Sequence, residues 1–225
     1  MMNFQNAKSI FTPNGEVMSI SRNGEVLWQK QTKPYKQELA YIESTGTQWI
    51  DTGVEIGSFT PSIKIKFSST VYGTAAYSGF YIGAMNGGSR GIGIKKSAVD
   101  TVYVRDYQHN ISTVGVDASA KWNEVFVNKV DGTITADGTV AKLTGFSWYS
   151  ANPTSFALFG TRNSKDGTIR STIVASIAYC QLFDDSMNLI ADLIPVLDYD
   201  DIPCMYDRVS GEFLYNQGTG EFLYG

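Results

Sequence analysis

The chain has 225 residues, of which 43% are hydrophobic, 13% aromatic and 18% charged. Its 13 Tyr, 12 Phe, 4 Trp and 22 Gly favour strands joined by tight turns and exclude a disordered chain. The net charge of −4 divides into +3 for residues 1–36 and −7 for the remainder. This acidic body lacks the clustered Lys and Arg that phosphate contacts need, so nucleic-acid binding is excluded.

The first 30 residues repeat one phrase, because NGEV at 14–17 returns nine residues later at 23–26. Asn-Gly pairs tolerate positive φ and are strong hairpin signals. The spacing predicts a three-stranded β-meander with turns at 14–15 and 23–24. A module of residues 1–30 is too small to keep a core alone, so we expect it to pack on another surface. The start MMNFQNAKSIF lacks a basic region followed by an apolar run, so no signal peptide is expected.

Residues 31–37, in the polar and basic segment QKQTKPYKQ, are expected to form a linker ahead of a domain over 38–225. In that domain PSIKIKF alternates strictly, with Ile63, Ile65 and Phe67 on one face, which is the period of a half-buried strand. Further strands are predicted within 100–107, 122–130, 155–160 and 171–183. No window of 12 residues has helical periodicity with caps, and no run of about 18 apolar residues could span a membrane.

The C-terminus carries a second doubled phrase, GEFLY at 211–215 and again at 220–224. It predicts a hairpin with a turn at 216–219. Hairpin formation alone accounts for both doubled phrases. Cys180 and Cys204 are too few for a disulfide framework and are expected to be buried thiols.

Both ends of the 38–225 segment resemble a known family. The phrase ELAYIESTGTQWIDTGV (38–54), the tail LIPVLDYDDIPCMYDRVSGEFLYNQGTGEF (193–222) and, in pattern only, KWNEVFVNKVDGTITADGTV (121–140) are similar to concanavalin A-like, laminin-G-like jelly-roll domains. Such domains occur in proteins of bacteriophages and prophages of gut bacteria. The resemblance implies an all-β jelly-roll sandwich whose first and last strands pair, which would place residues 41–50 beside the C-terminal hairpin. The segment KSIFTPNGEVMSISRNGEVLW resembles leader segments of phage tail and fibre proteins more weakly.

The resemblance also implies a function. It suggests a non-enzymatic virion protein of a tail, fibre or capsid decoration, with 1–30 attached to other virion proteins and 38–225 facing host-surface or mucus glycans. Fibre-like proteins are often symmetric, so a homo-oligomer is expected, with a trimer as one option. Three alternatives stay open: a bacterial carbohydrate-binding or adhesion module, a structural decoration domain without a ligand, and a glycan hydrolase.

Few residues in this sequence could serve in catalysis. The single histidine, His109, would have to be the base of any Ser-His-Asp triad, and no Gly-x-Ser-x-Gly elbow is present. Glucanase relatives of this fold carry a Glu-x-Asp-x-x-Glu phrase, which the eight Glu of this chain do not form. Glu124 is the best isolated candidate, but it has no carboxylate partner two residues away. No catalytic residue is therefore expected.

Metal binding has a weak signal. Residues 171–207 contain seven Asp and no Lys or Arg, and laminin-G relatives sometimes bind Ca²⁺ at the sandwich rim. The run DYDD (198–201) lacks EF-hand spacing, and turns favour Asp for their own reasons. No cofactor is expected, and Ca²⁺ is left as an open option.

Aromatic residues in polar loops are the signal for glycan binding, because sugar C–H faces stack on aromatic rings. The loop TGFSWYSANPTS supplies one cluster and RDYQHN another, while VYGTAAYSG adds Tyr72 and Tyr77. The competing explanation is that such residues cap the ends of a sandwich, and Trp49 and Trp122 are expected in the core. The predicted glycan contacts are Trp148, Tyr149, Asn152, Tyr107, His109, Asn110 and Arg105.

Overall fold

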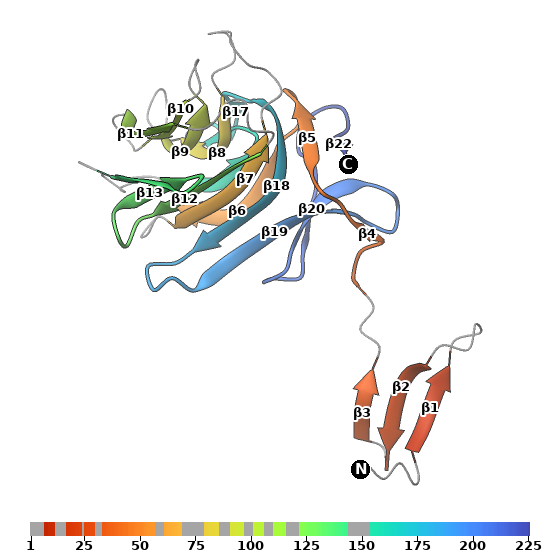
Figure 1. Ribbon diagram of the computed structural model, residues 1–225. Helices are drawn as coiled ribbons and strands as arrows, with labels where there is room; N and C mark the ends of the chain where they lie inside the picture. Colours follow the sequence, from red (N-terminus) through yellow and green to blue (C-terminus); the bar gives the residue numbers. More distant parts are fainter. Residues whose placement is uncertain are drawn as a thin grey trace. The chain divides into compact units, whose positions relative to one another are not determined.

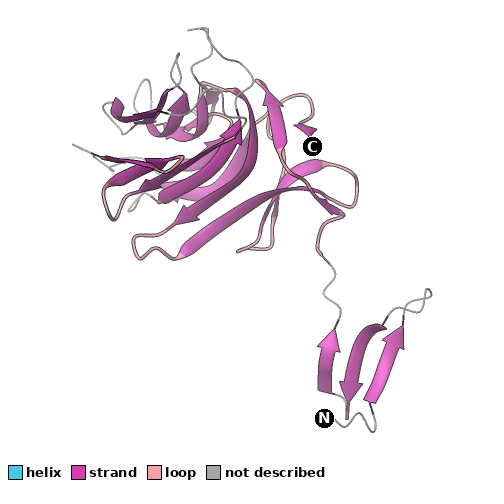
Figure 2. Cartoon of the chain, in the orientation of Figure 1, coloured by secondary structure: helices cyan, strands magenta, loops and turns pink. Residues whose placement is uncertain are grey.

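The computed structural model describes residues 7–11, 17–23, 25–29, 33–56, 61–68, 79–85, 91–96, 101–105, 110–115, 122–143 and 154–225. The chain separates into two compact units, residues 1–34 and residues 35–225. Every regular element in the described part is a strand (Figure 2). No helix there has the length and apolar character needed to cross a bilayer.

The first unit is the expected meander. Strands β1 (Ala7–Phe11), β2 (Val17–Arg22) and β3 (Glu25–Gln29) pair antiparallel in the order β1-β2-β3. The turn between β2 and β3 places Asn23 at φ 53°, the left-handed conformation that an Asn-Gly turn requires. Among the residues of this sheet whose exposure is described, 19–23 and 25–26, none is buried, and Val26 is 59% exposed.

The second unit starts earlier than the sequence suggests. Tyr35, expected in the linker, is buried, and its ring lies 5.3 Å from that of Tyr206. Residues Gln37–Glu38 form strand β4, which pairs with β19 (Leu189–Leu197). Composition alone could not reveal this, because a polar, Lys-rich segment gives no sign that one of its aromatic rings packs on the domain.

Two sheets make up the second unit (Figure 1). Sheet I has the order β11 (Asn110–Gly115), β10 (Thr101–Arg105), β9 (Gly91–Lys96), β8 (Phe80–Met85), β15 (Thr154–Leu158), β6 (Ile50–Ile56). In addition, β16 (Thr161–Asn163) pairs with β8, and β17 (Ile169–Arg170) pairs with β16.

Sheet II has the order β14 (Thr139–Lys142), β13 (Thr133–Ala136), β12 (Asn123–Asn128), β7 (Ser62–Ser68), β18 (Val174–Phe183), β19, β20 (Pro203–Asp207), β21 (Phe213–Leu214). In addition, β5 (Ile42–Thr45) lies between β18 and β22 (Leu223–Tyr224) and pairs with both.

The core lies between the two sheets. In β7, Ile63, Ile65 and Phe67 are buried and the two lysines between them are half-exposed, as the alternation predicts. The ring of Phe67 stacks on that of Tyr81 from sheet I, with centroids 3.7 Å apart. One continuous cluster of buried apolar side chains from both sheets results, which confirms the predicted all-β, sandwich-like fold.

The first and last segments of the domain meet in sheet II. Strand β18 pairs with β7 along one edge, while its other edge is shared by β5 and β19. Strand β22 pairs with β5, so the expected contact between residues 41–50 and the C-terminus is present. Phe222, just before β22, is buried, and its ring lies 5.3 Å from that of Phe159 in the core.

The predicted C-terminal hairpin is wrong. Strand β21 pairs with β20, and β22 pairs with β5, so the two copies of GEFLY belong to different strand pairs. The segment between them is bonded to another part of the chain, because the backbone N–H groups of Gln217 and Thr219 donate to the carbonyls of Trp49 and Thr47. Both copies nevertheless begin with a glycine at positive φ, 80° and 74°.

Gln48 is the polar centre of this closure. Its buried side-chain carbonyl accepts hydrogen bonds from the backbone N–H of Thr45 (2.8 Å) and the hydroxyl of Ser44 (3.1 Å). Its amide donates to the carbonyl of Glu221 at 3.1 Å. One side chain therefore links the start of the domain to its last strand.

The predictions that both cysteines are buried and that two tryptophans lie in the core have different outcomes. Cys180 and Cys204 are buried free thiols as expected, and burial raises the pKa of Cys204 to about 12. Trp49 and Trp122 are half-buried rather than central. Trp122 lies 5.7 Å from the ring of Tyr41, at the border of the sandwich.

Replacing Gln48 should weaken the whole domain. Gln48→Ala removes the side-chain partner of the Thr45 backbone N–H and of the Glu221 carbonyl, whereas the Ser44 hydroxyl keeps the backbone carbonyl of residue 48, so we expect a loss of about 2 kcal/mol in the free energy of unfolding. Urea denaturation followed by tryptophan fluorescence measures it. Gln217→Ala, which alters an exposed amide in the same closure, should change stability by less than about 0.5 kcal/mol. Equal effects of the two variants would contradict the role given to Gln48.

Candidate functional site

One end of sheet I gathers the ends of six neighbouring strands. Strands β6, β8 and β10 end there, and β15, β9 and β11 begin there, because adjacent strands run antiparallel. A single row of backbone partners crosses all six strands: Asn110, Arg105, Gly93, Gly83, Ala157 and Asp51. Segments far apart in the sequence therefore enter the sheet at one place.

This end is where both predicted glycan-binding segments join the sheet. Trp148, Tyr149, Asn152, Tyr107 and His109 lie outside the described residues, as do Tyr72 and Tyr77. Residues 106–109 connect β10 to β11, and residues 144–153 lead into β15 at Thr154. Strands β10 and β15 are three strand spacings apart, roughly 14 Å.

Of the predicted contacts, two lie on described backbone. Arg105 and Asn110 face each other as the last backbone pair between β10 and β11, where the register shifts by one residue. The backbones of Arg105 and Asn110 are therefore adjacent.

A small polar cleft opens at the same end, at the border of β6, β15 and β16. Its volume is about 140 Å³. Such a volume is below the roughly 300–1,000 Å³ of sites that enclose a whole drug-sized ligand, so the cleft suits one edge of a polar molecule. It is lined by Glu55, Thr154, Ser155, Arg162, Asn163, Ser164 and Gly167.

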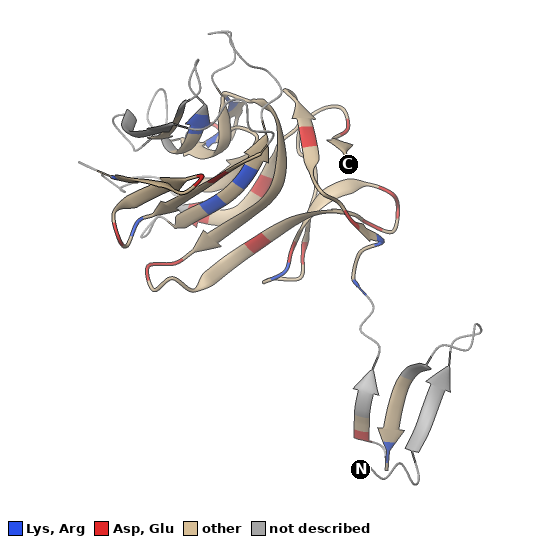
Figure 3. Cartoon of the chain, viewed as in Figure 1, with Lys and Arg blue, Asp and Glu red and all other residues tan. Residues whose placement is uncertain are grey.

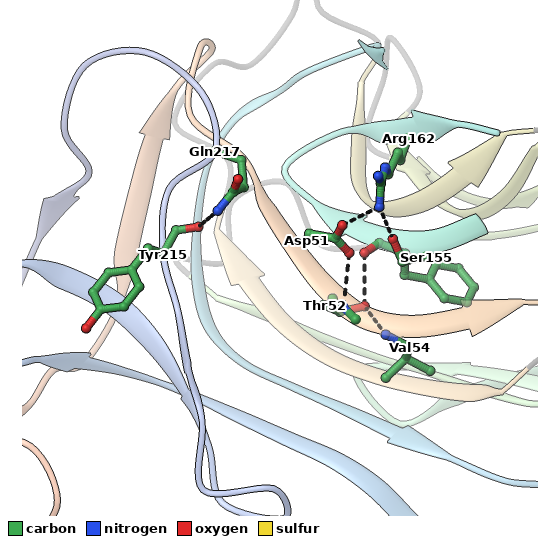
Figure 4. A network of polar contacts seen from close by, with 9 residues as sticks. Asp51, Thr52, Val54, Ser155, Arg162, Tyr215 and Gln217 are labelled. Carbon is green, nitrogen blue, oxygen red and sulfur yellow. Dashed lines mark hydrogen bonds and ion pairs between the residues drawn. The ribbon is translucent and has the colours of Figure 1, made fainter. Parts of the chain in front are cut away.

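Arg162 is the central side chain of the polar cleft (Figure 4). Its guanidinium forms an ion pair with Asp51 and donates a hydrogen bond of 2.8 Å to the hydroxyl of Ser155. The Arg162 side chain is still 37% exposed, against 28% for Asp51. Because a guanidinium has five N–H donors, Arg162 retains donors for a ligand.

Strand β6 has an irregularity that shapes this site. Glu55 lies four positions after Asp51, but their partners Ser155 and Ala157 are only two positions apart, so β6 bulges between them. Gly53 in the bulge has φ 70°. The hydroxyl of Thr52 donates to the carbonyl of Phe156 at 2.9 Å and fixes the bulge to β15 (Figure 4).

The far wall of the cleft is the turn between β16 and β17. The carboxylate of Asp166 accepts hydrogen bonds from the backbone N–H (3.0 Å) and hydroxyl (2.6 Å) of Thr168. Gly167 has φ 69°, as an Asp-Gly turn requires. The local sequence thus fixes the turn, and Arg162 and Asn163 reach the cleft on a short strand held beside β8.

Glu124, the best carboxylate from the sequence, lies elsewhere, on the outer face of sheet II. It pairs with Lys64 at 3.0 Å and accepts a hydrogen bond from the hydroxyl of Tyr179. Burial alone would raise the pKa of Glu124, but these contacts outweigh burial and lower it, while burial and Glu124 raise the pKa of Tyr179. A carboxyl held in its ionised form is unsuited to act as a general acid.

The acidic run near residue 200 forms a turn. The carboxylate of Asp198 accepts hydrogen bonds from the backbone N–H groups of Asp200 and Ile202, both at 2.9 Å, and from the hydroxyl of Tyr215 at 3.0 Å. In the described part of the chain, no three His, Cys, Asp or Glu side chains converge to hold a metal ion.

The described geometry defines a class: an all-β protein with a sandwich-like domain and a polar cleft at one end of sheet I. No model of a known protein family matches the sequence. A search of curated proteins gives no match either.

The pH dependence of stability should reflect Asp198. Burial alone would raise its pKa, but its three hydrogen bonds outweigh burial and lower that pKa. Asp198 therefore stabilises the fold above its unfolded pKa of about 3.9, and this contribution is lost as the pH falls through the folded pKa. Urea midpoints between about pH 6 and pH 3 should fall less steeply in Asp198→Asn than in the parent chain. Asp200→Asn, an exposed neighbour, should keep the parent profile, and identical profiles for all three proteins would refute this role.

Proposed function

We propose that the 35–225 domain is a non-enzymatic glycan-binding module with a concanavalin A-like jelly-roll fold. The observation that carries the proposal is that the polar cleft lies at the same end of sheet I at which both predicted glycan-binding segments join the sheet. Lectin-type recognition needs aromatic faces for sugar C–H groups and polar side chains for hydroxyls. The predicted loops supply the first and the cleft supplies the second.

The chemistry of the polar cleft suits a sugar edge. Arg162 and Thr154 offer hydrogen-bond donors, and the Glu55 carboxylate offers acceptors at an exposed position. Asp51 holds Arg162 in place through their ion pair, so the donors are preorganised before a ligand arrives. A vicinal pair of hydroxyls can both accept from Arg162 and donate to Glu55.

Binding is favoured over hydrolysis by the number of carboxylates in the cleft. Glycosidases need two carboxyl groups about 5–9.5 Å apart on either side of the scissile bond. Among the described residues that line the polar cleft, Glu55 is the only acid, and the nearby Asp51 is engaged by a guanidinium. Hydrolysis is the second candidate function, because Asp51 and Glu55 do flank one bulge of β6.

The biological setting proposed is a bacteriophage virion. The support is the resemblance of residues 38–54 and 193–222 to phage and prophage domains of tails, fibres or capsid decorations. In this setting, the meander of unit 1 attaches the protein to other virion proteins, and the domain meets host-surface or mucus glycans. A bacterial adhesion module and a ligand-free decoration domain remain the alternatives, and the latter predicts no glycan binding at all.

Glycan binding can be tested on an array of bacterial surface polysaccharides and mucin glycans. The intact chain should bind a defined subset, and Glu55→Gln and Trp148→Ala should each weaken that binding by about tenfold, the cost of one charged hydrogen bond or one stacked ring. Glu212→Gln removes an equally exposed carboxylate from the turn after β20 and should bind like the parent.

Two results would overturn the proposal. Binding to no glycan by the folded parent chain would favour the structural decoration role. Sustained release of new reducing ends from a bound polysaccharide, abolished in Glu55→Gln, would establish hydrolysis instead.

A further inference from the structure

The polar cleft carries more negative than positive charge. Of the described residues that line it, two are charged: Glu55, which is exposed, and Arg162. Arg162 is already paired with Asp51, whereas Glu55 takes part in no ion pair within the described part of the chain. At this place two carboxylates therefore accompany a single guanidinium.

The charge of Arg162 is balanced before a ligand arrives. Its guanidinium contacts one carboxylate oxygen of Asp51 and donates to the hydroxyl of Ser155 at 2.8 Å (Figure 4). The other carboxylate oxygen of Asp51 accepts a hydrogen bond from the backbone N–H of Gly53 at 3.0 Å, which fixes this carboxylate to the bulge of β6. A ligand hydroxyl can accept from the remaining N–H groups of Arg162. A ligand carboxylate that approached the same groups would also approach Asp51.

The segments next to the cleft add little positive charge. Residues 57–60 (GSFT), which follow β6, and residues 144–153 (TGFSWYSANP), which precede β15, contain no charged residue. In the turn between β16 and β17, Arg170 is paired with Asp166 at 3.0 Å. Lys165 in that turn is exposed and is not among the residues that line the cleft. Among the described lining residues, the exposed carboxylate therefore meets no cation other than a guanidinium already held in an ion pair.

The charge of the whole domain acts in the same direction. Residues 37–225 have a net charge of −7, and Figure 3 shows acidic positions on strands and turns of this domain. A like charge brought next to a carboxylate costs binding free energy, and a binding site can use such repulsion to reject one ligand in favour of another. An acidic sugar meets this repulsion at the polar cleft, whereas an uncharged sugar does not.

We propose that Glu55 makes the polar cleft select uncharged glycans and reject those that carry carboxylates, such as glycans with uronic acids. The inference rests on the proposed glycan-binding function and adds the class of ligand. An ionised carboxylate is acceptor-only, so Glu55 can accept the O–H of a sugar hydroxyl but has nothing to donate to a ligand carboxylate. The same side chain thus favours a hydroxyl and disfavours an acid at one position.

A matched pair of ligands tests this selection with the full chain. A polysaccharide that the parent binds on the array is used in its neutral form and in a form whose C6 hydroxyls have been oxidised to carboxylates. If the bound polysaccharide contains uronic acids, its carboxyl-reduced form is the neutral member of the pair. Calorimetric titration in about 0.1 M NaCl should give about tenfold tighter binding of the neutral form. About 0.5 M NaCl should narrow the difference, because salt screens exposed charges.

Variants of Glu55 separate its effect from that of the net charge of the domain. Glu55→Gln keeps the size of the side chain but removes its charge, so the two forms should bind within about twofold of each other. Glu55→Lys should reverse the preference. Glu212→Gln, which removes an equally exposed carboxylate from the turn after β20, and Lys165→Gln should each retain the preference of the parent. Circular dichroism shows whether each variant folds.

The outcomes distinguish this inference from the proposed function. Binding of no glycan by the folded parent chain would remove both. Equal or tighter binding of the oxidised form by the parent, with binding weakened in Glu55→Gln, would leave the glycan site in place and overturn the charge selection. A preference for the neutral form that persists unchanged in Glu55→Gln would overturn it as well, since the discrimination would then come from the net charge of the domain.

Discussion

The structure of the 35–225 domain depends on two apolar sheet faces that cover each other. The first and last strands of this domain keep the two faces together. Strand β18 is the common element, since it pairs with β7 on one edge and divides its other edge between β5 and β19. That division would leave β5 with an open edge, and β22 fills it. Gln48 then satisfies buried polar groups from both ends of the domain, in a place where an unpaired group would cost about 1–3 kcal/mol.

The closure positions the two clefts in different ways. A cleft of about 310 Å³, whose lining includes Asp200, Ile202 and Phe222, is part of it, because the segment bonded to residues 47–49 forms one wall. The polar cleft is reached through β6, which follows the closure directly and bulges between Asp51 and Glu55. A bulge redirects side chains and often lies beside a functional site. Here it places the Asp51 carboxylate beside Arg162, which lies on β16, more than a hundred residues later in the chain.

Local patterns in the sequence were enough to predict the all-β class and several of the strands. The alternation of 62–68, the Asn-Gly turn at 23–24 and the aromatic, β-branched segments predicted strands that the structure contains. The C-terminal hairpin failed because a doubled phrase reports similar local geometry, here a glycine at positive φ, and not which strand is the partner. Arg162 and Glu55 were missed for a related reason: their meeting depends on a strand register that no local motif encodes. The Asp166-Gly167 pair is a local turn signal that could have located one wall of the cleft, although it was not among the predictions.

Hydrogen exchange with and without a bound polysaccharide tests the central claim most directly, because it locates the ligand without a mutation. If the ligand binds at the end of sheet I, amides of residues 51–56 and 154–164 should exchange more slowly in the complex, together with those of segments 106–109 and 144–153. Protection centred on the outer face of sheet II, around Lys64, Glu124 and Tyr179, or on residues 198–203 and 216–222, would contradict the assignment of the site.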